Sequence, residues 1–154
     1  MSLHTRVMVL GTVLAVALPA VGSAQATDGY VGSWVLNAAK STTTTGKLPK
    51  SETRSYSAVP NGYKFESKTA YVDGTTSSSS GTMLYDGKYH ATQITKDDSS
   101  TATRVDATTV KTQNKSGRSC TRVAAVGGKT MTMSCTSTDA AGKPSKWLSF
   151  YDKK

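Results

Sequence analysis

Short runs rich in tyrosine, valine, threonine and serine follow one another along most of the chain, each ending at a glycine-containing turn. In the run 63–72, the aromatic residues Tyr63 and Phe65 alternate with the charged residues Lys64 and Glu66. This alternation of apolar and polar positions is typical of a β-strand with one buried face. No segment shows a helical repeat of adequate length, so the pattern predicts an all-β protein.

The dipeptides Asn61-Gly62, Asp73-Gly74 and Asp86-Gly87 separate several of these runs. Each supplies the positive φ values that tight hairpin turns require. Asp97-Asp98 is a further predicted turn, and residues 38–51 have room for one helical turn before a loop. The predicted strands cover residues 30–37, 52–59, 63–72, 75–85, 88–95, 101–105, 108–112, 119–126, 129–138 and 146–151.

Consecutive hairpins predict an antiparallel up-and-down meander of about 8–10 strands, which protects its edges best by closing into a barrel. The stretch 119–138 carries both cysteines of the chain. If Gly127 and Gly128 form a two-residue turn, Cys120 lies directly opposite Cys135, and a cross-strand disulfide is within reach. A disulfide is favoured over a metal site in an exported chain with two cysteines.

The register of this hairpin has an alternative. A three-residue loop of Val126, Gly127 and Gly128 places Val123 opposite Met131, which suits the apolar pattern but puts the two cysteines on opposite faces. A slip of one residue reverses the face of every side chain, so the two registers make opposite predictions for the whole hairpin.

Several short motifs resemble those of the lipocalin and fatty-acid-binding-protein superfamily, and more specifically those of small lipocalin-like secreted proteins of bacteria. The resemblance rests on Gly32-Ser33-Trp34, LNAAKS (36–41), YDGK (85–88), GGKTMTM (127–133), DAAGKP (139–144) and FYDK (150–153). It implies a closed barrel in which Trp34 plugs one end, with a cavity for a small apolar or amphipathic molecule.

The first 26 residues have the features of a secretory signal peptide. Arg6 precedes an apolar run from Val7 to Val21, and Ala24-Gln25-Ala26 forms a cleavage pattern. The apolar run is too short for a comfortable transmembrane helix. We therefore expect a signal peptide at 1–26, one lipocalin-like domain at 27–154, and export to the periplasm or the medium without integral membrane insertion.

The chain is basic, with a formal net charge of +9 that falls by one when Arg6 is removed. A positive balance suits anionic partners. The lysines are scattered singly and form no basic stripe, so we expect no binding of nucleic acid.

Arg122 is the most informative charged residue. With the two-residue turn it shares a face with Met131, Met133, Cys120 and Cys135, and therefore points into an apolar interior. A buried arginine needs a partner, either the carboxylate of a ligand or a structural acceptor. The alternative is that Arg122 packs over the Trp34 ring at the closed end, as a basic residue does in many lipocalins.

A tyrosine-rich lining suits an amphipathic ligand because each ring offers an apolar face and a hydroxyl. The residues predicted to line a cavity with Arg122 are Tyr56, Tyr63, Phe65, Tyr71 and Tyr85. Gly32, Trp34 and Trp147 are predicted to be structural, the two tryptophans as parts of the core.

The sequence contains no recognisable catalytic motif. His90 is the single histidine after residue 26, so a zinc site of ordinary spacing cannot form, and no serine lies in a nucleophile elbow. We expect neither catalysis nor a cofactor or metal. The sequence favours a monomeric binding protein for a small amphipathic, anionic molecule; the alternative is a protein-interaction or inhibitor module with a filled barrel.

Overall fold

The computed structural model describes residues 28–44, 48–93, 98–138 and 141–154. The predicted signal peptide and residue Asp97 of the predicted turn lie outside these ranges. In the described part, no helix is long and apolar enough to span a membrane. The strands of the described residues are β1 (Gly32–Leu36), β2 (Thr42–Thr43), β3 (Ser51–Val59), β4 (Gly62–Ala70), β5 (Thr76–Leu84), β6 (His90–Ala91), β7 (Ser99–Arg104), β8 (Thr109–Asn114), β9 (Ser119–Ala124), β10 (Thr130–Thr138) and β11 (Pro144–Lys153).

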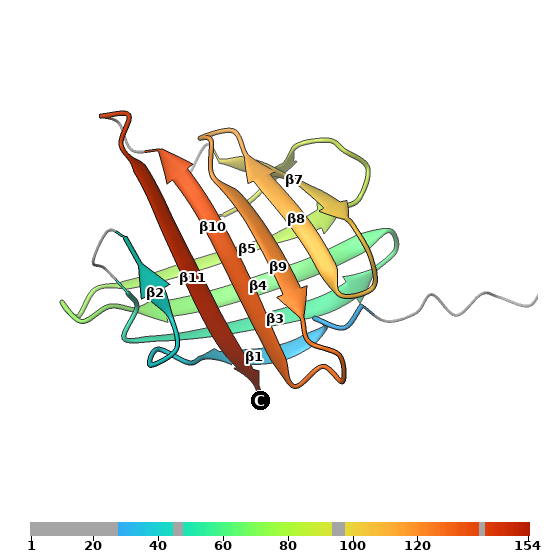
Figure 1. Ribbon diagram of the computed structural model, residues 1–154. Coiled ribbons are helices and arrows are strands. Elements are labelled where there is room, and N and C mark those ends of the chain that lie inside the picture. The colour runs from blue at the N-terminus through green and yellow to red at the C-terminus, as the bar shows by residue number, and fades with distance from the viewer. Residues whose placement is uncertain (1–27, 45–47, 94–97, 139–140) are drawn as a thin grey trace, which may run out of the picture.

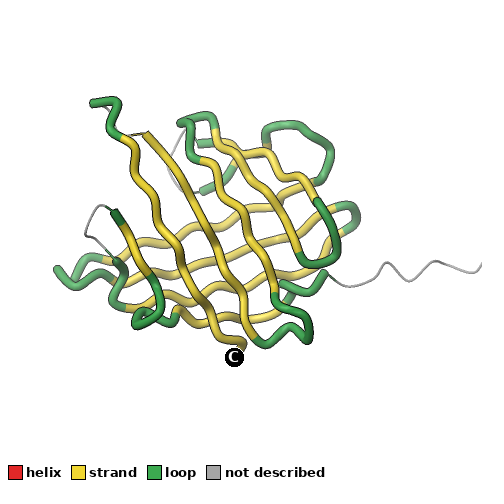
Figure 2. The backbone as a smooth tube through the Cα atoms, viewed as in Figure 1, coloured by secondary structure: helices red, strands yellow, loops and turns green. Residues whose placement is uncertain are grey.

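All strands belong to one sheet in the order β5-β4-β3-β1-β11-β10-β9-β8-β7-β6, and β2 pairs with β11. Neighbours are antiparallel, and β1 joins the first half of the sheet to the last strand. Figure 1 shows β8 to β11 crossing steeply in front of β3 to β5, and Figure 2 shows that both layers consist of strands. The predicted all-β meander closed into a barrel is confirmed.

The barrel closes along a narrow seam between β5 and the segment that follows β6. One bridge joins Gly81 to Thr92, and the Gln93 N–H donates to the Ser80 carbonyl at 2.8 Å. The strand predicted at 88–95 is reduced to the two residues of β6, and its residues 94–95 lie outside the described ranges. The seam is therefore a weakly paired junction of the barrel.

The segment before β3 differs most from its prediction. Tyr30, expected in the first strand, lies in a turn closed by a hydrogen bond from the Val31 N–H to the Asp28 carbonyl (2.9 Å). The predicted single turn after β1 is present, because the Ser41 N–H donates to the Ala38 carbonyl at 3.2 Å. The strand β2, which was not predicted, follows this turn. It is a strand because it pairs with β11, which is distant in the sequence.

Gly62 has a different role from the other predicted turn glycines. Gly74 and Gly87 adopt positive φ angles of 83° and 72°, but in the first turn the positive φ of 53° belongs to Asn61. A Cβ on Gly62 would lie 2.1 Å from the Met83 carbonyl oxygen, so glycine is required there by the close approach of β4 and β5.

The β9–β10 hairpin has the register of the two-residue turn but a longer loop. Cys120 pairs with Cys135, and the two sulfurs are bonded. The Ala125 N–H donates to the Thr130 carbonyl at 2.8 Å, and the Gly128 N–H donates to the Ala125 carbonyl at 2.8 Å. The connection is therefore a four-residue loop, 126–129, because the strand pairing stops earlier than expected.

Trp34 lies at the closed end of the barrel and has no exposed surface. Its Nε1–H donates to the Tyr30 carbonyl at 2.7 Å. The Lys153 ammonium lies over its ring, 5.3 Å from the centroid. The cation over the plugging tryptophan is thus supplied by the end of β11 rather than by Arg122.

Candidate functional site

A cavity of about 360 Å³ lies between the two layers of the barrel. Aromatic rings, methionines, serines and threonines make up most of its lining. Its charged lining residues, among those the structure describes, are three arginines and one glutamate: Arg54, Arg118, Arg122 and Glu52.

The structure brings most of the predicted site residues to this cavity. Those that line it are Tyr56, Tyr63, Phe65, Tyr71 and Arg122. Tyr85 lies outside the lining, and Trp147, expected as core, is part of it together with the disulfide of Cys120 and Cys135. Contact of these residues with a ligand stays a prediction.

Arg122 faces inward from β9 because it is two residues from Cys120 on the same side of the strand. The residue is 5% exposed. Its guanidinium carbon lies 4.3, 4.1 and 4.6 Å from the ring centroids of Tyr30, Tyr56 and Tyr63. These three rings meet one another edge to face and form a cage around the cation.

The predicted alternative, Arg122 over Trp34, is wrong for a geometric reason. Trp34 is opposite Lys153 in the β1–β11 pairing, at the very end of β11. Arg122 is opposite Met133, and Met133 is opposite Ser149, four residues before Lys153. Arg122 therefore enters the interior at a deeper level of the barrel.

The charge of Arg122 has no acid partner among the described residues. Its Nε and one of its Nη atoms are buried and have no hydrogen-bond acceptor in that part of the chain. Burial opposes the charge, but the Tyr56 and Tyr63 phenols outweigh it and raise the pKa of the Arg122 guanidinium above its ordinary value. The residue is a cation at any physiological pH.

A second charged group lies next to this cage on β3. Glu52 is 5% exposed, forms an ion pair with the Arg54 Nε, and accepts a hydrogen bond from the Tyr151 hydroxyl at 3.2 Å. Arg54 also donates to the Tyr56 hydroxyl at 3.5 Å. Burial raises the pKa of Tyr56, but Arg122 and Arg54 outweigh it, so this pKa is lowered overall.

Sequence reasoning missed Glu52 and Arg54, although a usable signal was present. Both are an even number of residues from Tyr56 along β3, so their side chains lie on the same face of the strand. Because Tyr56 was predicted to line the cavity, both had to face inward with it. The same rule applies to Arg118, which has the parity of Cys120 and Arg122 and also lines the cavity.

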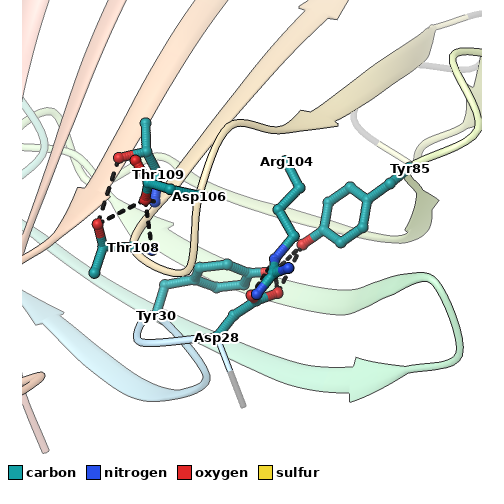
Figure 3. A network of polar contacts seen from close by, with 7 residues as sticks. All are labelled: Asp28, Tyr30, Tyr85, Arg104, Asp106, Thr108 and Thr109. Carbon is teal, nitrogen blue, oxygen red and sulfur yellow. Dashed lines mark hydrogen bonds and ion pairs between the residues drawn. The ribbon is translucent and has the colours of Figure 1, made fainter. Parts of the chain in front are cut away.

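A hydrogen-bonded network joins Asp28, Tyr30, Tyr85 and Arg104 (Figure 3). The Asp28 carboxylate accepts from the Tyr30 hydroxyl at 2.7 Å and the Tyr85 hydroxyl at 3.0 Å, and the two hydroxyls contact each other. Arg104 donates to the same carboxylate at 2.6 Å. Tyr30 thus presents its ring to Arg122 and its hydroxyl to this network, which Tyr85 also joins.

His90 offers no catalytic arrangement with the cavity. It lies outside the lining, and its Nε2 is 2.8 Å from the Asp86 Oδ1. This contact, together with the Lys88 backbone N–H, lowers the pKa of the Asp86 carboxyl. Within residues 28–44, 48–93, 98–138 and 141–154, no three His, Cys, Asp or Glu side chains gather as metal ligands would.

The strand order and the internal cavity define an antiparallel β-barrel with a lipocalin-like fold. No known protein family and no curated protein matches the sequence. Wild-type fluorescent protein UnaG has a similar structure, with a TM-score of 0.51, 11% sequence identity, and coverage of 81% of this chain and 97% of that one. A mutant of UnaG gives a TM-score of 0.52 at 11% identity, with coverage of 82% and 96%.

Zebrafish ileal bile acid-binding protein, solved with cholic acid, has a TM-score of 0.49 at 9% identity, over 82% of this chain and 99% of that one. The UnaG comparisons show the shared barrel fold, with little sequence in common.

Proposed function

We propose that this protein is an exported lipocalin-like binding protein that holds a small amphipathic anion inside its barrel without transforming it. The observation that carries the proposal is the charge of the cavity lining. Its described residues include three arginines and one glutamate, and Arg54 already pairs with that glutamate. An anionic ligand balances the positive charge that remains in the lining.

The lining suits an amphipathic molecule. Phe65, Met83, Met133 and Trp147 provide apolar surface, while serine and threonine hydroxyls leave the cavity partly polar. The acid group of the proposed ligand lies at Arg122, where the tyrosine cage holds the guanidinium in position. A filled interaction module has no need of such a cavity.

Export is supported by two features. The first 26 residues have the pattern of a cleaved signal peptide. The bonded Cys120–Cys135 pair suits an oxidising compartment. N-terminal sequencing of protein recovered from the exported fraction should find a new terminus near Thr27; an uncleaved terminus would contradict this part of the proposal.

The binding proposal is tested with two probes that share a ring system and differ in charge. 1-Anilinonaphthalene-8-sulfonate is an amphipathic anion, and N-phenyl-1-naphthylamine is its uncharged counterpart. The purified protein should bind the anion saturably and more tightly than the neutral probe, as measured by fluorescence titration. Arg122→Gln should weaken the anion about tenfold or more, because a charge-assisted contact is lost, and should leave the neutral probe nearly unchanged.

Lys111→Gln is the matched control, since it removes one positive charge from the exposed face of β8. It should change neither affinity. Circular dichroism shows whether Arg122→Gln folds. If it does not, Arg122→Lys, which keeps the positive charge, is used in its place. The absence of saturable binding, or equal binding of both probes that is insensitive to Arg122, would overturn the proposal.

A further inference from the structure

Two arginines enter the cavity from β9 and from the residue directly before it. Arg118 immediately precedes the strand and Arg122 lies within it, with Cys120 between them. At about 3.3 Å per residue, four residues of extended chain separate their Cα atoms by about 13 Å. The two cations therefore enter the cavity at different levels along the strand.

The opposite layer gives the same orientation independently. The Arg122 guanidinium lies 4.6 Å from the Tyr63 ring, at the beginning of β4. Tyr71, which directly follows the end of β4, is near enough to Arg118 to favour the charged form of its guanidinium. The two arginines thus lie near opposite ends of one crossing strand, and the Cys120–Cys135 disulfide and Phe65 line the same cavity.

Arg118 is held in place by its backbone. The buried Asn114 side chain accepts a hydrogen bond from the Arg118 N–H at 2.7 Å, and the Asn114 N–H donates to the Arg118 carbonyl at 2.9 Å. These bonds fix the β8–β9 turn, so that the side chain leaves the turn toward the cavity at a defined position.

Arg118 has the Asp98 carboxylate in its surroundings but does not form an ion pair with it. No ion pair to it is present in the described part of the chain. Burial lowers the pKa of its guanidinium, and repulsion from Arg54 lowers it further. Asp98 and Tyr71 raise this pKa, but it stays below the ordinary value. A cation in this position gains from an anion supplied by a ligand.

We infer that Arg118 forms a second anion subsite, and that the ligand is an elongated amphipathic molecule with an acid group at each end. One acid lies at Arg122, the apolar middle lies on the disulfide and Phe65, and the other acid lies at Arg118. This inference rests on the proposed function and specifies its ligand class.

The test compares straight-chain dicarboxylates with monocarboxylates of the same length. Decanedioate, dodecanedioate and tetradecanedioate, and the corresponding decanoate, dodecanoate and tetradecanoate, are titrated by calorimetry into the purified, disulfide-bonded protein. A dicarboxylate whose length spans the two arginines should bind about tenfold or more tightly than its monocarboxylate partner, because it makes a second charge-assisted contact.

Arg118→Gln should abolish that advantage and change monocarboxylate affinity less than about twofold, whereas Arg122→Gln should weaken both series. Lys111→Gln is again the control for net charge. Equal affinity for both series at every length, or a loss in Arg118→Gln that is the same for both, would overturn the second subsite alone. If neither series binds, the proposed function fails and the second subsite with it.

Discussion

Removal of the disulfide should cost stability by an amount that follows from its place in the chain. Cys120 and Cys135 are separated by 15 positions in the sequence. A chain-entropy treatment gives about 3 kcal/mol for a loop of this size, because the bond restricts the unfolded chain. The pairing of β9 with β10 remains without the bond, so Cys120→Ala/Cys135→Ala should fold, with a lower free energy of unfolding.

Urea denaturation followed by tyrosine and tryptophan fluorescence measures this change. With a slope of about 2 kcal/mol per molar urea, a loss of about 3 kcal/mol moves the midpoint down by about 1.5 M. Wild-type protein in a strong reductant should fall to nearly the same midpoint, and the double variant should not respond to reductant. A loss below about 1 kcal/mol, or a wild type insensitive to reductant, would refute the entropic reasoning.

Four further predictions concern the cavity and its surroundings. Trp147→Phe should abolish a ligand-induced change in tryptophan fluorescence while Trp34→Phe preserves it, because only the former ring lines the cavity; the reverse result would contradict the placement. In an ultraviolet phenolate titration, Tyr56→Phe should remove a fraction that ionises below the ordinary range, since two arginines outweigh the effect of burial on that pKa. Burial raises the pKa of Tyr85 to about 12, so its contribution to stability is fully present below about pH 10 and is lost as pH rises through about 12. Ser100→Leu should fill space in the cavity and weaken binding in the same titrations while the free energy of unfolding stays within about 1 kcal/mol; unchanged binding would place the ligand elsewhere.

Much of the fold could be predicted because its signals are local. The alternation of side chains and the turn dipeptides predicted most of the strands. Two hairpin registers stayed open in the sequence, and the structure has the one in which the two cysteines are opposite each other. β2 could not be predicted this way, because it exists as a strand through pairing with the distant β11, and that pairing is absent from the local pattern. The strand predicted at 88–95 is present, but only as the two residues of β6.

The candidate site was predictable in part for the same reason. Strand parity places Arg122 inward once the register is known, and the same parity would have found Arg54 and Arg118. The tyrosine cage is different, because Tyr30 lies in a turn before β1 and reaches Arg122 only through the crossing of the two layers. Which rings surround the cation depends on that crossing.

The position of the cavity follows from an uneven distribution of side-chain size. The largest fully buried side chains include Trp34, Tyr30 and Tyr63, and the last two form part of the cage around Arg122. Along the lining, small residues such as Ser100 and Ser149 occupy positions where a sealed core would carry Leu or Ile. The large rings cage the Arg122 cation, and the small residues leave space beside it. A barrel built only for stability would fill that space and pair that charge, so the two features together favour a binding site.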